Sequence, residues 1–221
     1  YGKQSIDKSD EKNVLKALRS DFITQGPLVE KFEDTLKKYF NSKYSIAVTN
    51  GSSALFLIGK ILGWKKGDLI AVPPITFISS VNSIEHCNAK PIFVDITMTD
   101  YCMDHKKLEK VLKNDRRKKI KAAIITDYGG QPANFKEFYK LKKKYRITLI
   151  NDNCHSIGST INANRGYAVK YADLVSLSFH PVKAITTGEG GAILTNFLPY
   201  AKIAKKLRSH GIEREKNKYW Q

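Results

Sequence analysis

Apolar residues occur in seven short runs, and in the longer stretches between them they recur mostly at helical spacing. The runs are residues 44–49, 69–72, 91–94, 120–126, 147–150, 174–178 and 192–195. Each run is apolar almost throughout, which is typical of strands buried on both faces. Helical patterns cover residues 52–62, 77–87, 105–112 and 134–145. The alternation predicts an α/β fold with a seven-stranded, mostly parallel sheet and helices on both faces.

Two further helices are expected before the first strand. The segment Ser9-Asp10-Glu11 is typical of a helix start. Pro27 suits the first turn of the next helix, which would bury apolar side chains at helical spacing, namely Val29, Phe32, Leu36 and Phe40. No repeat or low-complexity linker interrupts the pattern. We therefore expect one large domain over residues 1–221, with N-terminal helices in 1–42, the sheet and its site in 43–196, and a last helix in 197–221.

The composition limits the partners that we expect. The chain has 221 residues and a formal net charge of +17, which raises nucleic acid as a partner. However, the lysines are spread along the chain, and neither aromatic–basic interleaving nor zinc-finger spacing is present. No apolar run approaches membrane-spanning length. We expect neither nucleic acid nor a membrane as partner, and attribute the charge to a lysine-biased composition or to attraction of an anionic substrate.

The three cysteines are Cys87, Cys102 and Cys154, an odd number without a C-x-x-C pair. Reduced thiols in a cytoplasmic protein are the simplest interpretation, and no metal site is expected. The chain starts at Tyr1, not at methionine, and ends after a charged stretch. We expect it to be part of a longer protein.

Candidate chemistry lies where the expected strands end, because ligands of parallel sheets bind beyond the carboxyl ends of the strands. The first strand is followed by Asn50, Gly51, Ser52 and Ser53 at the start of a helix. Free amide groups and the helix dipole at such a start favour a phosphate. An ordinary serine cap is the alternative.

Three more strands are followed by residues of interest. Phe77, after the second strand, is either an aromatic platform or part of the core. Asp152 follows the fifth strand with His155 three residues later, and a helix cap is the alternative reading of the acid. Lys183 follows Ser178 at the tip of a glycine-bounded turn, where it is either a nucleophilic amine or a solvated lysine.

Together these features meet the needs of one cofactor. Pyridoxal 5'-phosphate (PLP) requires an amine, a carboxylate that keeps the pyridine nitrogen protonated, a phosphate cradle and a flat aromatic partner. All four are expected at the same edge of the sheet, so their combination predicts a PLP site more specifically than any one of them.

Motifs along almost the whole chain match one family. They include Asn50-Gly-Ser-Ser-Ala-Leu55, Tyr128-Gly-Gly-Gln-Pro132, Asp152-Asn-Cys-His-Ser-Ile-Gly158, Ser178-Phe-His-Pro-Val-Lys183, Gly188-Glu-Gly-Gly191 and Arg208-Ser-His-Gly211. The chain resembles the DegT/DnrJ/EryC1/StrS sugar aminotransferases, which have the fold-type-I PLP architecture. The Lys183 loop is most similar to the transaminases of pseudaminic acid biosynthesis. The resemblance implies transfer of an amino group from glutamate to a 4-keto-6-deoxy nucleotide sugar, in cell-surface glycan or pseudaminic acid synthesis.

The resemblance also implies roles for individual residues. Lys183 would bind the cofactor covalently and move the proton, Asp152 would pair with the ring nitrogen, and His155 would lie near the ring hydroxyl. Phe77 would stack on the ring, and Gly51, Ser52, Ser53 and Ser178 would hold the phosphate. The family's dehydratases have histidine in place of the lysine, so Lys183 favours amino transfer.

Family members continue into a smaller C-terminal domain and build the site across a two-fold interface. The resemblance therefore implies a homodimer and a missing C-terminal domain, including a contact that the partner subunit donates. Two other classes remain open. One is another fold-type-I PLP enzyme, a sugar dehydratase or a lyase. The other is a non-catalytic relative that acts as a regulator or binds nucleic acid.

Overall fold

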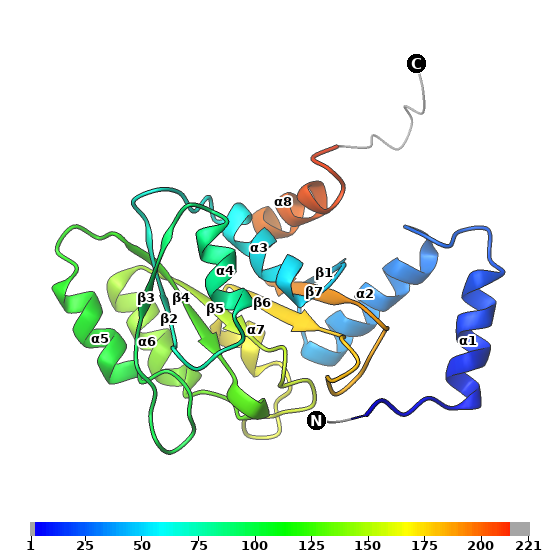
Figure 1. The fold of residues 1–221 in the computed structure, drawn as a ribbon, viewed down its shortest axis with the longest axis horizontal. Coiled ribbons are helices and arrows are strands. Elements are labelled where there is room, and N and C mark those ends of the chain that lie inside the picture. The colour runs from blue at the N-terminus through cyan, green and yellow to red at the C-terminus, as the bar shows by residue number, and fades with distance from the viewer. Residues whose placement is uncertain (1–2, 213–221) are drawn as a thin grey trace.

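The computed structural model describes residues 3–212 and places seven strands in one sheet (Figure 1). The strands are β1 (Tyr44–Val48), β2 (Leu69–Val72), β3 (Lys90–Phe93), β4 (Ile120–Thr126), β5 (Thr148–Asp152), β6 (Leu174–Ser178) and β7 (Gly191–Thr195). Their order is β1-β7-β6-β5-β4-β2-β3, and β7 alone runs antiparallel to its neighbours β6 and β1. The predicted α/β fold with a seven-stranded, mostly parallel sheet is confirmed.

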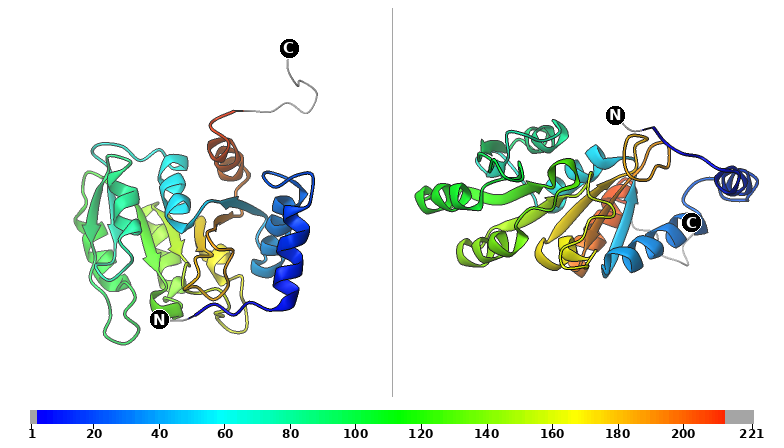
Figure 2. Two further views of the ribbon diagram at one scale, coloured as in Figure 1. Left: turned by 45° about the vertical axis from the view of Figure 1, so that its right-hand side comes forward. Right: turned by 90° about the horizontal axis from the view of Figure 1, so that it is seen from below.

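Helices cover both faces of this sheet (Figure 2). They are α1 (Lys8–Leu18), α2 (Pro27–Phe40), α3 (Gly51–Ile61), α4 (Ser79–Glu85), α5 (His105–Asn114), α6 (Phe135–Tyr145), α7 (Tyr167–Tyr171) and α8 (Leu198–Arg208). Helices α2, α5, α6 and α7 share one core with the sheet, and α3, α4 and α8 share the other. Successive strand residues alternate between the cores, as Ile124 and Ile125 of β4 do, which explains why the strands are apolar throughout.

The N-terminal helices differ from expectation in detail. Helix α1 is capped by Asp7, not by the segment from Ser9, because the Asp7 carboxylate accepts hydrogen bonds from the amides of Ser9 and Asp10. None of its residues is buried, and it stands apart from the sheet in Figure 1. Helix α2 buries Leu36 and Phe40 as predicted, whereas Val29 and Phe32 are only half-buried.

The last predicted segment, 197–221, is only partly described. Residues 198–208 form α8, and residues 213–221 lie outside the described part of the chain. Within residues 3–212, no helix has both the length and the apolar character needed to cross a membrane.

One buried ion pair joins α2 and α8 to the sheet. The Glu33 carboxylate of α2 accepts hydrogen bonds from the Ala47 amide of β1 (2.8 Å) and from the Arg208 guanidinium at the end of α8 (2.5 Å). The two side chains are only 9% and 20% exposed. Removing one partner would leave the other charge buried without compensation.

We expect Glu33→Gln to lower the free energy of unfolding by about 3 kcal/mol, because it strands the Arg208 charge. Urea denaturation measures the change. The control is Lys37→Ala on the same helix, which breaks the exposed Lys37–Asp34 pair and should cost no more than about 0.5 kcal/mol. Equal losses in the two variants would show that the buried pair contributes no more to stability than the exposed pair.

Candidate active site

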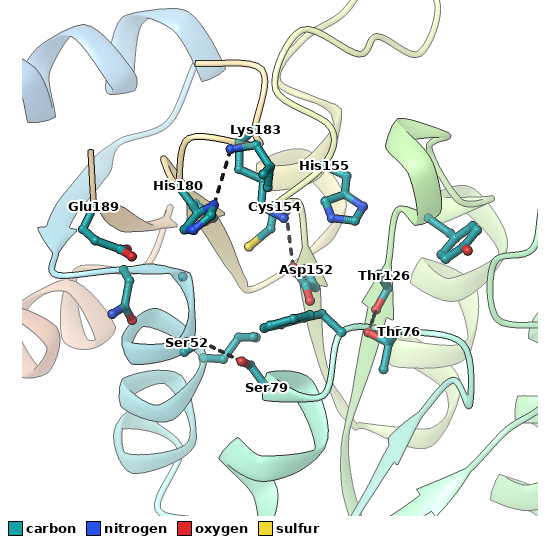
Figure 3. A pocket seen from close by; sticks show the side chains of 17 residues that line it. Ser52, Thr76, Ser79, Thr126, Asp152, Cys154, His155, His180, Lys183 and Glu189 are labelled. Atoms are coloured by element: carbon teal, nitrogen blue, oxygen red, sulfur yellow. Dashed lines mark hydrogen bonds between the residues drawn. The ribbon is translucent and has the colours of Figure 1, made fainter. Parts of the chain in front are cut away.

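A cavity of about 340 Å³ opens at the carboxyl ends of the parallel strands (Figure 3). This volume lies within the range of about 300–1,000 Å³ that is typical of small-molecule sites. The lining residues come from the start of α3, the segment between β2 and α4, the start of α4, the ends of β4, β5 and β6, and the loop before β7. They are Asn50, Gly51, Ser52, Leu55, Thr76, Phe77, Ser79, Thr126, Tyr128, Asp152, Cys154, His155, Ser178, His180, Val182, Lys183 and Glu189.

The start of α3 offers amide groups to this cavity. The Asn50 side chain caps the helix by accepting a hydrogen bond from the Ser53 amide (2.8 Å). The first helical bond runs from the Ala54 amide to the Asn50 carbonyl (3.1 Å), so the amides of Gly51 and Ser52 have no partner within the helix. The Ser52 hydroxyl lies 2.6 Å from the Ser79 hydroxyl. Amides and hydroxyls at a helix start are suited to an anion.

Two glycines let α3 approach the ends of β6 and β7 closely. A Cβ atom on Gly191 would lie 2.4 Å from the backbone carbon and oxygen of Asn50, which no side chain can tolerate. A Cβ atom on Gly51 would lie 2.9 Å from Cβ of Ser178 and 3.1 Å from Sγ of Cys154. The close packing brings Ser178 and Cys154 beside the start of the helix.

Lys183 lies in a loop between β6 and β7 that is closed at its base. The Phe179 amide donates to the Gly190 carbonyl (2.8 Å), and the Phe179 carbonyl accepts from the Thr187 amide (3.0 Å). The Phe179 side chain is fully buried, with its ring 5.2 Å from that of Phe32. At the tip, the Lys183 amide donates to the His180 carbonyl (2.9 Å), forming a turn that carries the lysine at the cavity.

Asp152 is the buried acid of the cavity, with an exposure of 3%. Its carboxylate accepts hydrogen bonds from the Ser80 hydroxyl (2.8 Å) and, through its other oxygen, from the Cys154 amide (3.3 Å). Figure 3 shows Asp152, His155 and Lys183 around one hollow, with Ser52 and Ser79 at its other side. An anion-binding helix start, a buried carboxylate and a lysine therefore meet in one cavity.

The electrostatics of the two neighbouring side chains also reflect this arrangement. Burial, followed by the Lys183 charge, lowers the pKa of His155 below its usual range, which favours a neutral imidazole. Burial, reinforced by the Asp152 charge, raises the pKa of the Cys154 thiol well above its usual range, although Lys183 opposes this. Cys154 is therefore a neutral thiol and not a candidate nucleophile.

The structure brings together most of the residues that the sequence singles out. Gly51, Ser52, Phe77, Asp152, His155, Ser178 and Lys183 all line the cavity. Ser53 does not line it. Its amide is bound to Asn50, and its hydroxyl accepts a hydrogen bond from the Thr49 hydroxyl (2.9 Å).

Sequence reasoning missed several lining residues. His180 and Glu189 belong to the Lys183 loop, so the position of that loop could have indicated them. Ser79 is the first residue of α4 and follows Phe77 closely. The expected helix, 77–87, placed Ser79 inside the helix and not at its start, so the sequence did not indicate it. Within residues 3–212, no cluster of three or more His, Cys, Asp or Glu side chains is placed to hold a metal ion.

A second buried carboxyl, Asp127, lies at the end of β4 and outside the cavity lining. It accepts hydrogen bonds from the Ala133 amide (3.1 Å), the Asn153 side-chain amide (3.0 Å) and the Tyr167 hydroxyl (2.7 Å). Burial nevertheless outweighs these bonds and raises the pKa of Asp127 from 3.8 to about 6. The neutral carboxyl is therefore favoured in the folded protein, relative to the unfolded chain.

This shift predicts a pH dependence of stability. A raised pKa gives stabilisation that is complete below the unfolded value of 3.8 and is lost as the pH rises through about 6. Between about pH 4 and about pH 7.5, we expect the protein to lose roughly 2.5 kcal/mol relative to Asp127→Asn, which cannot ionise. Denaturation across this pH range measures it, with Asp21→Asn at an exposed position as the control. Parallel pH curves for the protein and Asp127→Asn would contradict the shift.

Comparison with known proteins identifies the family. The sequence profile of the DegT/DnrJ/EryC1/StrS aminotransferase family matches residues 4–221. The chain belongs to this family. It is 38% identical over 217 residues to UDP-4-amino-4,6-dideoxy-N-acetyl-beta-L-altrosamine transaminase from Campylobacter jejuni, a match that covers 98% of this chain and 56% of that relative.

Solved structures agree in fold. Helicobacter pylori PseC, an aminotransferase involved in the biosynthesis of pseudoaminic acid, superposes with a TM-score of 0.88 at 29% identity, covering 99% of this chain and 58% of that chain. A putative sugar aminotransferase from Streptococcus pneumoniae in its PLP form gives a TM-score of 0.85 at 27% identity, covering 94% of this chain and 57% of that chain. The chain thus spans little more than half the length of the relatives that it matches.

Proposed function

We propose that this chain forms the cofactor-binding part of a PLP-dependent aminotransferase that transfers an amino group from glutamate to a 4-keto-6-deoxy nucleotide sugar. The observation that carries the proposal is the meeting of Lys183, Asp152 and the start of α3 in one cavity. An amine, a buried acid and an anion-binding helix start are the groups that PLP requires of a protein. The family and its named relatives support the same reaction class.

The residues of the cavity fit this cofactor. The free amides of Gly51 and Ser52, with the hydroxyls of Ser52 and Ser178, would hold the phosphate. Asp152 is positioned by Ser80 and would keep a proton on the pyridine nitrogen. Phe77, which is 64% exposed at the cavity, would cover one face of the ring. His155 would lie near the ring hydroxyl.

When bound, PLP supplies an electron sink that makes a proton beside the amine nitrogen acidic enough to transfer. The chain's own groups would then control that proton. The Lys183 amine would hold the cofactor and, once the amino group of the donor has replaced it there, its free Nζ atom would accept and return the proton. The loop closed at Phe179 holds this amine over the cavity, and the neutral imidazole of His155 adds no competing positive charge.

Three further elements belong to the proposal. Transaminases of a UDP-linked 4,6-dideoxy-N-acetyl amino sugar are among the relatives, which supports a nucleotide sugar as acceptor, in cell-surface glycan or pseudaminic acid synthesis. We propose a homodimer in the cytoplasm, the compartment in which three unpaired cysteines stay reduced. Lys183 favours amino transfer over dehydration.

Lys183 is tested by covalent trapping. We expect PLP added to the protein to give a visible absorbance band, and borohydride reduction to fix the label on the peptide that contains Lys183. Lys183→Ala should lose both, while Lys202→Ala at an exposed position of α8 should keep both. A label scattered over surface lysines would contradict the proposed role.

The phosphate cradle is tested with paired ligands. We expect Ser52→Ala to weaken PLP binding by roughly tenfold, because it removes a hydroxyl from the anion site, corresponding to about 1.4 kcal/mol. Binding of pyridoxal, which lacks the phosphate, should not change. Ser53→Ala is the matched control, since Ser53 does not line the cavity. Equal effects on both ligands would place Ser52 elsewhere in the site.

A further inference from the structure

Asp127 is a buried acid that does not line the cavity, and burying its carboxyl group costs free energy. It is fully buried, and among the described residues no lysine, arginine or histidine forms an ion pair with it. Only neutral donors hold it, and burial dominates its electrostatics. A buried carboxyl of this kind costs stability and is better explained by what it orders than by the stability that it adds.

The bonds of Asp127 join two chain segments that carry cavity residues. Asp127 lies between Thr126 and Tyr128, which both line the cavity. Its partner Asn153 lies between Asp152 and Cys154, which also line it. The Asp127 amide in addition donates to the Asp152 carbonyl (3.2 Å). The Asp127–Asn153 bond therefore connects the ends of β4 and β5 directly behind the site.

Asn153 is itself fixed on several sides. Its side-chain amide also lies within hydrogen-bond distance of the Asn151 side-chain oxygen (3.0 Å) and the Tyr167 hydroxyl (2.9 Å). Asn153 is fully buried, as is Tyr167 apart from 2% of its surface. The side-chain nitrogen has two hydrogens for these three acceptors, and Oδ1 of Asn153 has no hydrogen-bond partner among the described residues, so the position of Asn153 depends on the bonds to Asp127, Asn151 and Tyr167.

We propose that Asp127 is a positioning residue for the cofactor site: through Asn153 it fixes the direction in which Asp152 and His155 leave β5. The proposal rests on the proposed function, since it concerns side chains assigned to PLP. A displacement of these side chains by a fraction of an ångström weakens contacts to a bound ring, although Asp127 never touches it.

A matched control is available at the start of β5, the end of that strand away from Asp152. Asp173 is also buried, and it accepts hydrogen bonds from the Leu149 amide of β5 (2.9 Å) and from Lys142 (2.6 Å). It thus anchors β5 far from the cavity. Asp173→Asn should destabilise the protein without moving Asp152 or His155.

The first test compares PLP affinity and stability. We expect Asp127→Asn and Asn153→Ala to raise the dissociation constant for PLP by about tenfold each, the scale on which outer partners of a site act. Asp173→Asn should change it by less than about twofold, although it lowers Tm, because Asp173 lies outside the cavity lining. The double variant Asp127→Asn/Asn153→Ala should bind PLP no more weakly than the single variant with the lower affinity. Both substitutions remove the same hydrogen bond, the one between Asn153 and Asp127. Affinity losses that follow Tm in all three variants, or that add in the double variant, would overturn the proposal.

The second test needs no cofactor. We expect hydrogen exchange in Asp127→Asn to accelerate in a peptide spanning residues 153–159, while Asp173→Asn leaves that peptide unchanged. Equal acceleration in both variants would overturn the positioning role. If the protein itself binds no PLP, the proposed function fails, and this exchange comparison still decides whether Asp127 orders the end of β5.

Discussion

The cavity depends on how closely the start of α3 lies to the end of β6 and the start of β7. Gly191 and Gly51 occupy the contact, and neither position has space for a side chain. Because β6 leads directly into the loop that holds Lys183, the same contact fixes the distance between the anion-binding amides and the lysine. A larger residue at either position would separate the two halves of the proposed cofactor site without altering any polar group. The chemistry is therefore set by backbone packing as much as by the polar residues.

The sequence predicted the fold and most of the site because both follow from one regularity. Parallel strands buried on both faces read as uninterrupted apolar runs, and their carboxyl ends share one edge of the sheet. Residues directly after those runs, such as Asp152 and Lys183, could therefore be expected together. Helix caps and loop paths could not be predicted in this way, because the apolar runs carry no information about them. Asn50, not a serine, caps α3, and this cap turns the Ser53 amide away from the cavity. His180 and Glu189 depend on the path of a loop, which apolar periodicity does not describe.

The strongly basic composition has little part in the cavity. Of the described residues that line it, Lys183 is the only lysine, and none is an arginine. The dense runs 116–119 and 142–144 precede β4 and β5, so they lie toward the opposite edge of the sheet. The charged residues of the cavity lining, Lys183, Asp152 and Glu189, contribute nothing to the net positive charge of +17. At the start of α3, the groups that the cavity offers to an anion are amides and hydroxyls, whose dipoles need no counter-charge to be buried.

The motifs that carry the family resemblance hold residues with two physical roles. Some of these residues line the cavity, and others support it from outside. Phe179 packs on Phe32 at the base of the lysine loop, and Arg208 donates a hydrogen bond to Glu33, which also accepts one from the backbone of β1. These contacts tie α2 and α8 to the strands beside the loop, so that the loop closes over a rigid frame. The buried Asp127 network does the same at the ends of β4 and β5. A side chain on a loop, as Lys183 is, needs such support, because a loop alone does not hold it at a fixed position in a cavity.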